Sequence, residues 1–462
     1  MLRSHNLGEV NEGLIGKKVE LCGWVDTIRE HGSLIFIDIR DKYGKVQTII
    51  HKKKGDFSKA KDLTLESSIK VVGEVKARPE GTINENMASG KVEVSINSLE
   101  IFNKCPPLPF QINDTTVTEE VRLKTRFLDL RSRRMQKSIA LRSDLILNIL
   151  DFFRFEGFTY IETPILGKST PEGARDFIVP SRKHPGGFYA LPQSPQLFKQ
   201  LSQVAGFDKY IQVARCFRDE DSRKDRQPEF TQIDLEMSFV EQEDVMEVLE
   251  RMVVYAFEKT LGIRLKTPFK RISYDEAMKK YGRDNPDLRK ETGEEFAFCW
   301  VVDFPAFEWN EDEKRYKSVH HPFTQPKPDE FYTNHPEKAK SFAYDLVLNG
   351  SEIGGGSIRI HEGEMQKKVF DILNISSNEA KKKFGFLLEA LSYGAPPHGG
   401  FALGLDRFAQ LMIGRENIRE VIAFPKNSEA YDLMLDAPSE ISEEQLKEVS
   451  IKLDLSEKKD KK

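Results

Sequence analysis

The segment from Tyr210 to Phe239, YIQVARCFRDEDSRKDRQPEFTQIDLEMSF, places about a dozen charged residues between two runs that are typical of buried strands. The sequence therefore predicts a long β-hairpin with a charged loop. Guanidinium groups bind phosphate through two parallel hydrogen bonds, so Arg218 and Arg226 in this loop indicate a nucleoside triphosphate as ligand. A solvated loop held by surface ion pairs is the alternative interpretation.

Two preceding motifs contain residues that would surround a small polar ligand. TPEGARDF carries Glu172, and QSPQLFKQ carries Gln196 and Lys199, which lie one helical turn apart if this segment is helical. Glu172 and Gly173 form the crest of a loop that we expect to act as a lid, although an exposed turn would have the same composition.

The motif YDLVLNGSEIGGGSIRIH spaces Asp345, Glu352 and Arg359 seven residues apart around a turn and a glycine triplet. Mg²⁺ prefers oxygen ligands and usually takes only one or two from the protein when phosphates are present. Asp345 and Glu352 are therefore the predicted metal ligands.

The motif PPHGGFALGLDRFAQLM runs from a glycine-rich strand into an amphipathic helix whose first turn holds Asp406 and Arg407. Helix N-termini attract anions, so Arg407 is placed to bind a terminal phosphate. Neither GxxxxGK[ST] nor a GxGxxG following a strand occurs in the sequence, which excludes the P-loop and dinucleotide-binding architectures.

The first 104 residues read as a separate domain of short strands. Five β-rich runs are separated by turn signals, with one interlude between the third and fourth, which favours a small closed barrel of the OB type. Such barrels bind single-stranded nucleic acid through aromatic stacking and polar side chains. The candidates here are Arg29, Phe36, Gln47 and Glu93; Phe36 as an ordinary core residue is the alternative.

Cys105-Pro-Pro-Leu-Pro ends this domain, and we expect a hinge or linker over 105–135. A helix from Leu141 to Phe155 and a strand from Thr159 to Glu162 open the second domain, predicted over 136–440. Residues 441–462 read as a C-terminal tail. Together these elements predict an α+β fold.

Composition supports a globular protein with room for a cleft. The chain has 462 residues, 39% hydrophobic and 31% charged, with a formal net charge of −4. No apolar run is long enough to cross a bilayer, so we expect a cytoplasmic protein with no membrane contact. The four cysteines are widely spaced and indicate buried thiols.

The motifs, taken in order, resemble the class II aminoacyl-tRNA synthetases. The helix and strand ending at Pro164, the FRDED hairpin and GLDR at 404–407 look like the three signature motifs of that class. TPEGARDF, QSPQLFKQ, RQPEFTQID, HHPFT and GSEIGGGSIRIH look like the bacterial aspartate-specific enzymes within it. The resemblance implies an anticodon-binding OB barrel and an antiparallel catalytic sheet flanked by helices, in a homodimer that uses ATP, Mg²⁺, L-aspartate and tRNA(Asp).

The resemblance also assigns roles to individual residues. Those implied for ATP are Arg218, Asp219, Glu220, Gln227, Phe230, Glu352, Gly404, Leu405, Asp406 and Arg407, with Arg218, Glu352 and Arg407 as catalytic groups. Those implied for aspartate are Glu172, Gln196, Lys199, Arg218, Asp234, His320 and Arg359. Lys199 and Arg359 would select a carboxylate, because asparagine would leave both buried cations unpaired.

The sequence departs from this resemblance in one place. Bacterial relatives carry an inserted domain after YGRDNPDLR, where only about residues 290–297 fill the gap here. His31 and Gly81, in barrel loops, resemble residues of enzymes that also charge tRNA(Asn); a strictly discriminating enzyme is the alternative. An asparagine-specific synthetase or an asparagine-forming paralogue is less favoured.

Overall fold

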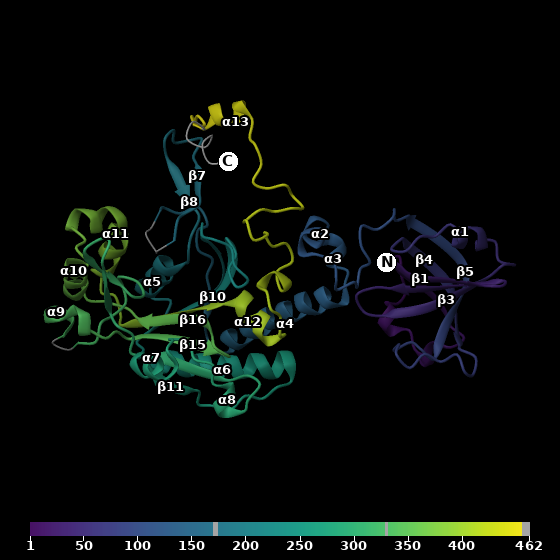
Figure 1. Cartoon of the computed structure of the whole chain (residues 1–462), viewed down its shortest axis with the longest axis horizontal. Coiled ribbons are helices and arrows are strands. Elements are labelled where there is room, and N and C mark those ends of the chain that lie inside the picture. Colours follow the sequence, from purple (N-terminus) through teal and green to yellow (C-terminus); the bar gives the residue numbers. More distant parts are fainter. Residues whose placement is uncertain (170–173, 329–330, 455–462) are drawn as a thin grey trace. The chain divides into compact units, whose positions relative to one another are not determined.

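The computed structural model describes residues 1–169, 174–328 and 331–454 (Figure 1). The chain divides into two compact units, Met1–Val117 and Thr118–Lys462. No described helix is long and apolar enough to cross a membrane.

The first unit is a closed barrel with strand order β1-β2-β3-β5-β4. Alternate residues such as Val19, Leu21 and Val25 are buried in a core of its own. The predicted OB architecture is confirmed, including the interlude, which is helix α1. The strands are β1 (Lys18–His31), β2 (Leu34–Arg40), β3 (Lys45–His51), β4 (Ser68–Ala77) and β5 (Val92–Asn103), and α1 is Phe57–Lys61.

The second unit is built on an eight-stranded sheet with order β11-β12-β15-β16-β17-β10-β9-β6. The pairs from β12 to β9 are antiparallel, whereas β11 with β12 and β6 with β9 are parallel. The strands are β6 (Thr159–Tyr160), β9 (Lys209–Phe217), β10 (Glu229–Ser238), β11 (Lys270–Ser273), β12 (Phe298–Val302), β15 (Ala343–Leu348), β16 (Ser351–Ile358) and β17 (His398–Gly404).

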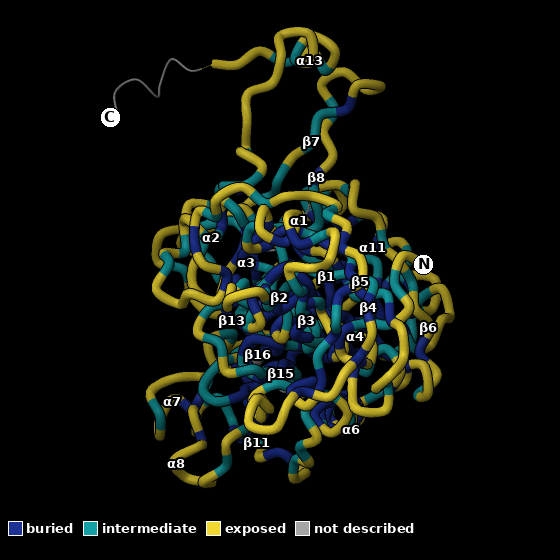
Figure 2. The backbone as a smooth tube through the Cα atoms, turned by 90° about the vertical axis from the view of Figure 1, so that its right-hand side faces the viewer, coloured by how far each residue is buried: buried dark blue, intermediate teal, exposed yellow. Residues whose placement is uncertain are grey.

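Helices cover both faces of this sheet, as predicted (Figures 1 and 2). The main core lies between one face and helices α4 (Arg133–Phe155), α6 (Gln242–Leu261) and α12 (Leu405–Met412). A smaller cluster gathers α5 (Gln196–Val204), α10 (Gly363–Ile372) and α11 (Ser377–Leu391). Successive residues of a strand point to opposite faces of the sheet, which explains the division. Trp300 lies in the main core, whereas its neighbour Val301 lies in a third cluster with α7 (Tyr274–Tyr281).

The remaining elements are short. They are α2 (Glu119–Lys124), α3 (Arg126–Asp129), β7 (Ile178–Pro180), β8 (Phe188–Ala190), α7 (Tyr274–Tyr281), α8 (Arg289–Thr292), β13 (Phe307–Asn310), β14 (Arg315–Ser318), α9 (Phe331–Asn334) and α13 (Glu443–Glu448), with 3₁₀ turns at Leu7–Glu9, Glu12–Leu14, Pro336–Lys338 and Ile418–Glu420.

The second half of the expected linker is folded. Residues after 118 form α2 and α3, and buried Arg126 donates hydrogen bonds to the carbonyls of Arg419, Ile422 and Ala423. This arginine ties the segment to the second unit, and proline content alone did not reveal it. The expected tail likewise begins with a helix, α13, whose Ser442 and Gln445 form a capping box.

Candidate active site

Strand β10 separates core residues from site residues. Ile233 and Leu235 face the main core, so Asp234 and Glu236 between them lie on the opposite face, where both are fully buried. The predicted hairpin of β9 and β10 is confirmed, and its returning strand therefore brings two carboxylates to the floor of the site.

The neighbouring strands place small residues beside these carboxylates. The register aligns Asp234 with Ala402, Ala402 with Gly355, and Gly355 with Asp345, in a row across four strands. A Cβ on Gly355 would lie 2.5 Å from Asp345 Oδ1. Glycine is therefore required here, because a side chain would displace the Asp345 carboxylate.

Two adjoining cavities of about 590 Å³ and 320 Å³ open on this floor and share Arg218, Gln232, His320, Gly355 and Ala402. The larger cavity is lined by Arg218, Glu220, Gln227, Phe230, Asp345, Glu352, Gly404, Asp406 and Arg407. The smaller is lined by Gln196, Lys199, Arg218, Asp234, His320, His321 and Arg359. The structure thus brings the residues predicted for ATP into one cavity and those predicted for aspartate into the other, with exceptions given below.

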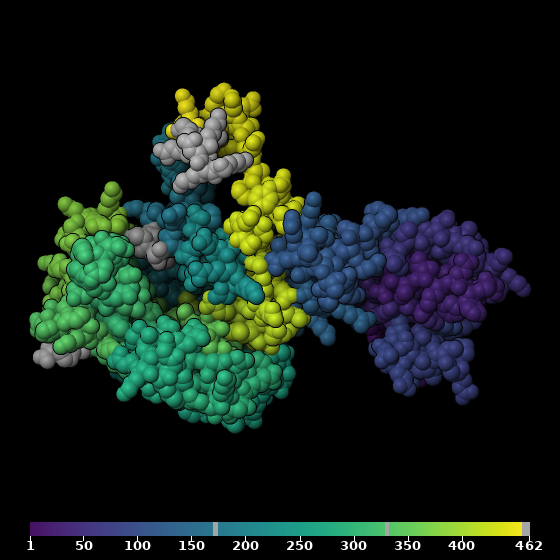
Figure 3. Space-filling view, in the orientation of Figure 1, coloured from purple at the N-terminus to yellow at the C-terminus, as the bar shows by residue number. Residues whose placement is uncertain are grey.

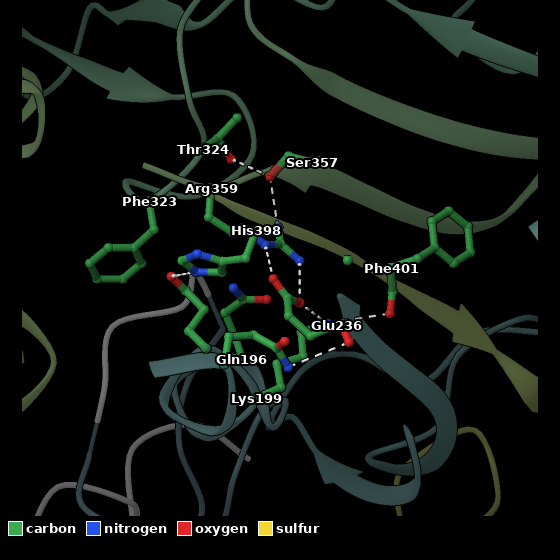
Figure 4. A network of polar contacts seen from close by, with 12 residues as sticks. Gln196, Lys199, Glu236, Phe323, Thr324, Ser357, Arg359, His398 and Phe401 are labelled. Carbon is green, nitrogen blue, oxygen red and sulfur yellow. Dashed lines mark hydrogen bonds and ion pairs between the residues drawn. The ribbon is translucent and has the colours of Figure 1, made fainter. Parts of the chain in front are cut away.

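The smaller cavity is lined by part of a cluster of four buried charged residues, Lys199, Asp234, Glu236 and Arg359. Figure 4 labels Lys199, Glu236 and Arg359 of this cluster. Lys199 Nζ donates to Asp234 Oδ1 at 3.1 Å and lies 3.5 Å from Glu236 Oε2. Arg359 binds both oxygens of Glu236, with Nε to Oε1 at 2.8 Å and Nη2 to Oε2 at 3.1 Å. The two cations are therefore balanced by two carboxylates.

This pairing corrects one part of the sequence-based argument. Lys199 and Arg359 were expected to be unpaired until a substrate carboxylate arrived, but Asp234 and Glu236 already compensate them. A buried cation without a partner would be too costly to maintain in the empty protein. Selection of a carboxylate must therefore depend on the direction of the remaining donors rather than on an unpaired charge.

Glu236 is a site residue that the sequence reasoning missed, as are His321 and Asp284, which line the cavities. Burial acts to raise the pKa of Glu236, but Arg359 and Lys199 outweigh it and hold this pKa below the ordinary value. A Cβ on Gly400, the strand partner of Glu236, would lie 2.0 Å from Glu236 Oε2. The alternation of side chains along the strand could have revealed Glu236, because it lies on the same face of the sheet as the predicted site residue Asp234.

Arg359 has little freedom in this network. Its Nη1 donates to Ser357 Oγ at 2.7 Å and lies 2.8 Å from His321 Nε2. With the two bonds to Glu236, these contacts engage four of its five N–H groups among the described residues. The guanidinium is therefore fixed, and one N–H of Nη2 is left for a ligand.

The two histidines of HHPFT differ in position. His320 lines both cavities, and burial followed by the charge of Arg359 lowers its pKa from 6.5 to about 4. His321, beside Arg359, also has a strongly lowered pKa, chiefly because of burial. Both imidazoles are therefore neutral at pH 7, and His321 accepts a hydrogen bond from Arg359.

The larger cavity is bordered by arginines. The Arg218 guanidinium lies 5.0 Å from the centre of the Phe230 ring, and Arg407 Nη2 lies 3.1 Å from Asp225 Oδ2. Arg407 Nη1 also donates to the carbonyl of Glu352 (2.5 Å). The cavity thus combines an aromatic ring with these two guanidinium groups, as a base and its phosphates would require.

Some predicted nucleotide residues have structural partners. Asp406 accepts from Arg142 Nη2 at 2.8 Å and from the Thr231 N–H at 2.8 Å, which joins α12, α4 and β10. Gln227 exchanges two hydrogen bonds with the backbone of Lys426. The yellow C-terminal segment accordingly lies beside the teal hairpin in Figure 3.

Two predicted residues lie away from the larger cavity. Leu405, the first residue of α12, is fully buried in the main core. Asp219 is exposed, and its N–H donates to the carbonyl of Arg175. Motif position alone suggested them, whereas the turn of the helix and the path of the loop direct their side chains elsewhere. Glu172 lies outside the described residues.

Four buried polar atoms in these cavities have no hydrogen-bond partner among the described residues. They are the donors Gln196 Nε2 and Arg218 Nε and the acceptors Asp234 Oδ2 and Asp345 Oδ1. Buried polar atoms are rarely left unpaired, because desolvation without a hydrogen bond costs about 1–3 kcal/mol. Their convergence indicates a ligand with both acidic and cationic groups.

In the barrel, four predicted residues are connected. Arg29 Nη2 donates to Gln47 Oε1 at 3.0 Å, and Gln47 Nε2 donates to Glu93 Oε2 at 2.8 Å. Phe36 pairs with Arg29 in the register of β1 and β2 and is half-buried, outside the barrel core. His31 and Gly81 are both exposed, but only Gly81, with φ +81°, lies in a loop, whereas His31 is the last residue of β1 and not a loop residue as expected.

Comparison of the sequence with models of known protein families identifies the class to which this fold and site belong. The model of class II tRNA synthetases (D, K and N) matches residues 118–428, and that of the OB-fold nucleic acid binding domain matches residues 19–102. The chain therefore belongs to the class II tRNA synthetases.

Two proteins similar to this chain share one name within that class. The aspartate–tRNA(Asp/Asn) ligase of Hydrogenobaculum sp. is 43% identical over 593 positions, covering 98% of this chain and 100% of the relative. That of Thermotoga maritima is 42% identical over 579 positions with the same coverage. These alignments are longer than the 462 residues of the chain, so the relatives carry residues with no counterpart here, together about as many as a small domain has.

Solved structures agree with this assignment. Asparaginyl-tRNA synthetase from Pyrococcus horikoshii, complexed with asparaginyl-adenylate, matches with a TM-score of 0.77 and 27% identity over 92% of this chain and 98% of that chain. Aspartyl-tRNA synthetase from Entamoeba histolytica, at 23% identity and a TM-score of 0.75 over 92% of both chains, shares the fold.

Proposed function

We propose that the protein attaches L-aspartate to tRNA in two steps, through an aspartyl-adenylate made from ATP. The observation that carries this proposal is the pair of adjoining cavities, one bordered by arginines and one by the four-charge cluster, with Arg218 lining both. The relatives named aspartate–tRNA(Asp/Asn) ligases support the same reaction.

The smaller cavity suits aspartate rather than asparagine. The free N–H of Arg359 and the unpaired Gln196 Nε2 are donors, whereas Asp234 Oδ2 is an acceptor for an ammonium group. A carboxylate accepts from such donors, but an amide would direct its own N–H₂ at one of them. We therefore assign the side-chain carboxylate to Arg359 and the ammonium to Asp234; an asparagine-specific enzyme or an asparagine-forming paralogue is the second candidate.

Positioning and charge stabilisation would carry out the chemistry. The aspartate α-carboxylate attacks the α-phosphorus and pyrophosphate leaves; the terminal ribose hydroxyl of tRNA then attacks the carbonyl carbon of the mixed anhydride, and AMP leaves. Arg218 lies where the two cavities meet, so it stabilises charge developing at the α-phosphate, and Arg407 serves the outer phosphates. No protein nucleophile is needed in this sequence of steps.

The donor set fits Mg²⁺. Burial, followed by the charges of Glu352 and Asp284, raises the pKa of Asp345 well above its ordinary value, and Asp345 Oδ1 is unpartnered. A divalent cation would relieve both, and Asp345 with Glu352 would hold it against the phosphates. When bound, the ion would neutralise phosphate charge during attack and departure of pyrophosphate.

A homodimer is part of this proposal. Strand β6 lies at the edge of the sheet, and large apolar side chains on it and on α4 are exposed, with Tyr160 at 46%, Leu147 at 60% and Phe155 at 74%. Such exposed apolar side chains beside the edge strand of a sheet favour a second copy of the chain as their cover.

Sedimentation equilibrium tests the proposed homodimer. The wild-type protein should be a dimer, and Phe155→Glu should shift it toward monomer. A monomeric wild type would contradict the assignment. We place the enzyme in the cytoplasm, with its tRNA and amino-acid substrates.

Replacing Arg218 tests the catalytic assignment. Arg218→Ala should lower aspartate-dependent pyrophosphate exchange by about a hundredfold or more, because it removes a donor from the developing charge. Lys224→Ala is the matched control, since Lys224 is exposed in the same loop and is not a lining residue. Normal exchange in a folded Arg218→Ala protein would contradict the assignment.

Two exposed residues of the barrel allow a prediction about which tRNAs are charged. His31 at the end of β1 and Gly81 in a loop leave small or polar groups exposed, and the relatives are named for both tRNA(Asp) and tRNA(Asn). We expect the enzyme to aspartylate both purified tRNAs, and Gly81→Lys to reduce charging of tRNA(Asn) more than that of tRNA(Asp). Charging of tRNA(Asp) alone at high enzyme concentration would establish a discriminating enzyme instead.

A further inference from the structure

The segment between α7 and α8 brings a third carboxylate to the larger cavity. Asp284 lines this cavity together with Asp345 and Glu352, although it comes from a different part of the chain. It belongs to the motif YGRDNPDLR, whose aspartates have no role in the assignments given above.

Asp284 is held in place by the hairpin that carries the other two carboxylates. The preceding Arg283 donates from Nη2 to the carbonyl of Gly350 at 3.1 Å, in the turn between β15 and β16. Leu288, a few residues later, is 1% exposed and packs in one cluster with Val347 of β15. The segment is therefore anchored on both sides of Asp284 to the strands of Asp345 and Glu352.

Residues between α8 and β12 also contact the β15–β16 turn. Asn349 Oδ1 accepts from the Ala297 N–H at 2.8 Å, and Asn349 Nδ2 donates to the Glu295 carbonyl at 2.9 Å. The segment between α8 and β12 is therefore tied directly to the β15–β16 turn. The position of Asp284 thus depends on contacts within the catalytic unit itself.

A buried oxygen atom without a hydrogen-bond partner indicates where a cation would bind in the larger cavity. Asp345 Oδ1 has no hydrogen-bond partner among the described residues, and the floor of Gly355 leaves it open to the cavity. Three carboxylates facing a triphosphate would repel it unless cations intervene. Among the described residues, no three acidic, histidine or cysteine side chains meet closely enough to be direct ligands of one ion.

We propose that Asp284 is the outer carboxylate of a Mg²⁺–triphosphate site, attracting the cation through its coordinated water while Asp345 and Glu352 face it directly. Mg²⁺ retains several waters and takes few protein ligands, which suits a third carboxylate outside the inner coordination shell. The inference rests on the proposed ATP site but is independent of the amino acid and the tRNA.

Mn²⁺ binding tests this role in the full chain without turnover. Mn²⁺ would be titrated by electron paramagnetic resonance in the presence of adenosine 5′-(α,β-methylene)triphosphate, comparing wild type with Asp284→Asn. The matched control is Glu276→Gln, an exposed acid on neighbouring α7 that does not line the cavity. We expect Asp284→Asn to weaken Mn²⁺ binding about tenfold, as loss of one nearby unit charge implies, and Glu276→Gln to leave it unchanged.

Binding of the same nucleotide in excess EDTA separates this role from a structural one. Without a metal ion, Asp284 only repels the phosphates, so Asp284→Asn should bind the nucleotide as well as or better than wild type. Unchanged Mn²⁺ affinity, or weaker binding both with and without metal, would overturn the proposal. Neither result would affect the assignment of aspartate as substrate.

Discussion

The catalytic unit depends on keeping two cations and two carboxylates out of water at the centre of its sheet. Transferring each charge into the interior costs several kcal/mol, so Lys199 and Arg359 are stable there only because Asp234 and Glu236 compensate them. This requirement extends to the surroundings. Gly400 must lack a side chain so that the Glu236 carboxylate fits, and Ser357 and His321 must take up the other N–H groups of Arg359. What remains for a substrate is a fixed set of donors and one free carboxylate oxygen, which is a more selective arrangement than unpaired charge.

Arg226 and Arg407 in the larger cavity are more exposed and more weakly paired than the cations of the smaller one. Their partners are Glu220 for Arg226 and Asp225 for Arg407. These pairs are exchangeable, because surface ion pairs contribute little to stability. A polyanion can therefore replace the carboxylates at small cost. A site with an adaptable region for a phosphate chain and a rigid region for an amino acid suits a reaction in which geometry provides most of the catalysis.

Sequence reasoning succeeded where a pattern reports directly on local structure. The hairpin around Arg218, the barrel strands and the glycine-rich strand leading into α12 all follow from alternation and turn signals, and the cavities collect most of the residues predicted for them. It failed where the outcome depends on a distant partner. Leu405, the first residue of α12, is buried in the main core, and Asp219 is exposed in a loop whose backbone pairs with Arg175. The folded start of the catalytic unit depends on Arg126 meeting carbonyls almost 300 positions away, which no local pattern contains.

The central claim is that the balanced four-charge cluster selects aspartate, and it is tested most directly by pyrophosphate exchange with the wild-type protein at saturating ATP. L-aspartate and L-asparagine would be compared over a range of concentrations. We predict that kcat/KM favours L-aspartate by about a thousandfold or more, since an amide would leave buried donors and acceptors mismatched. Exchange supported equally well by L-asparagine, or by L-asparagine alone, would contradict this account.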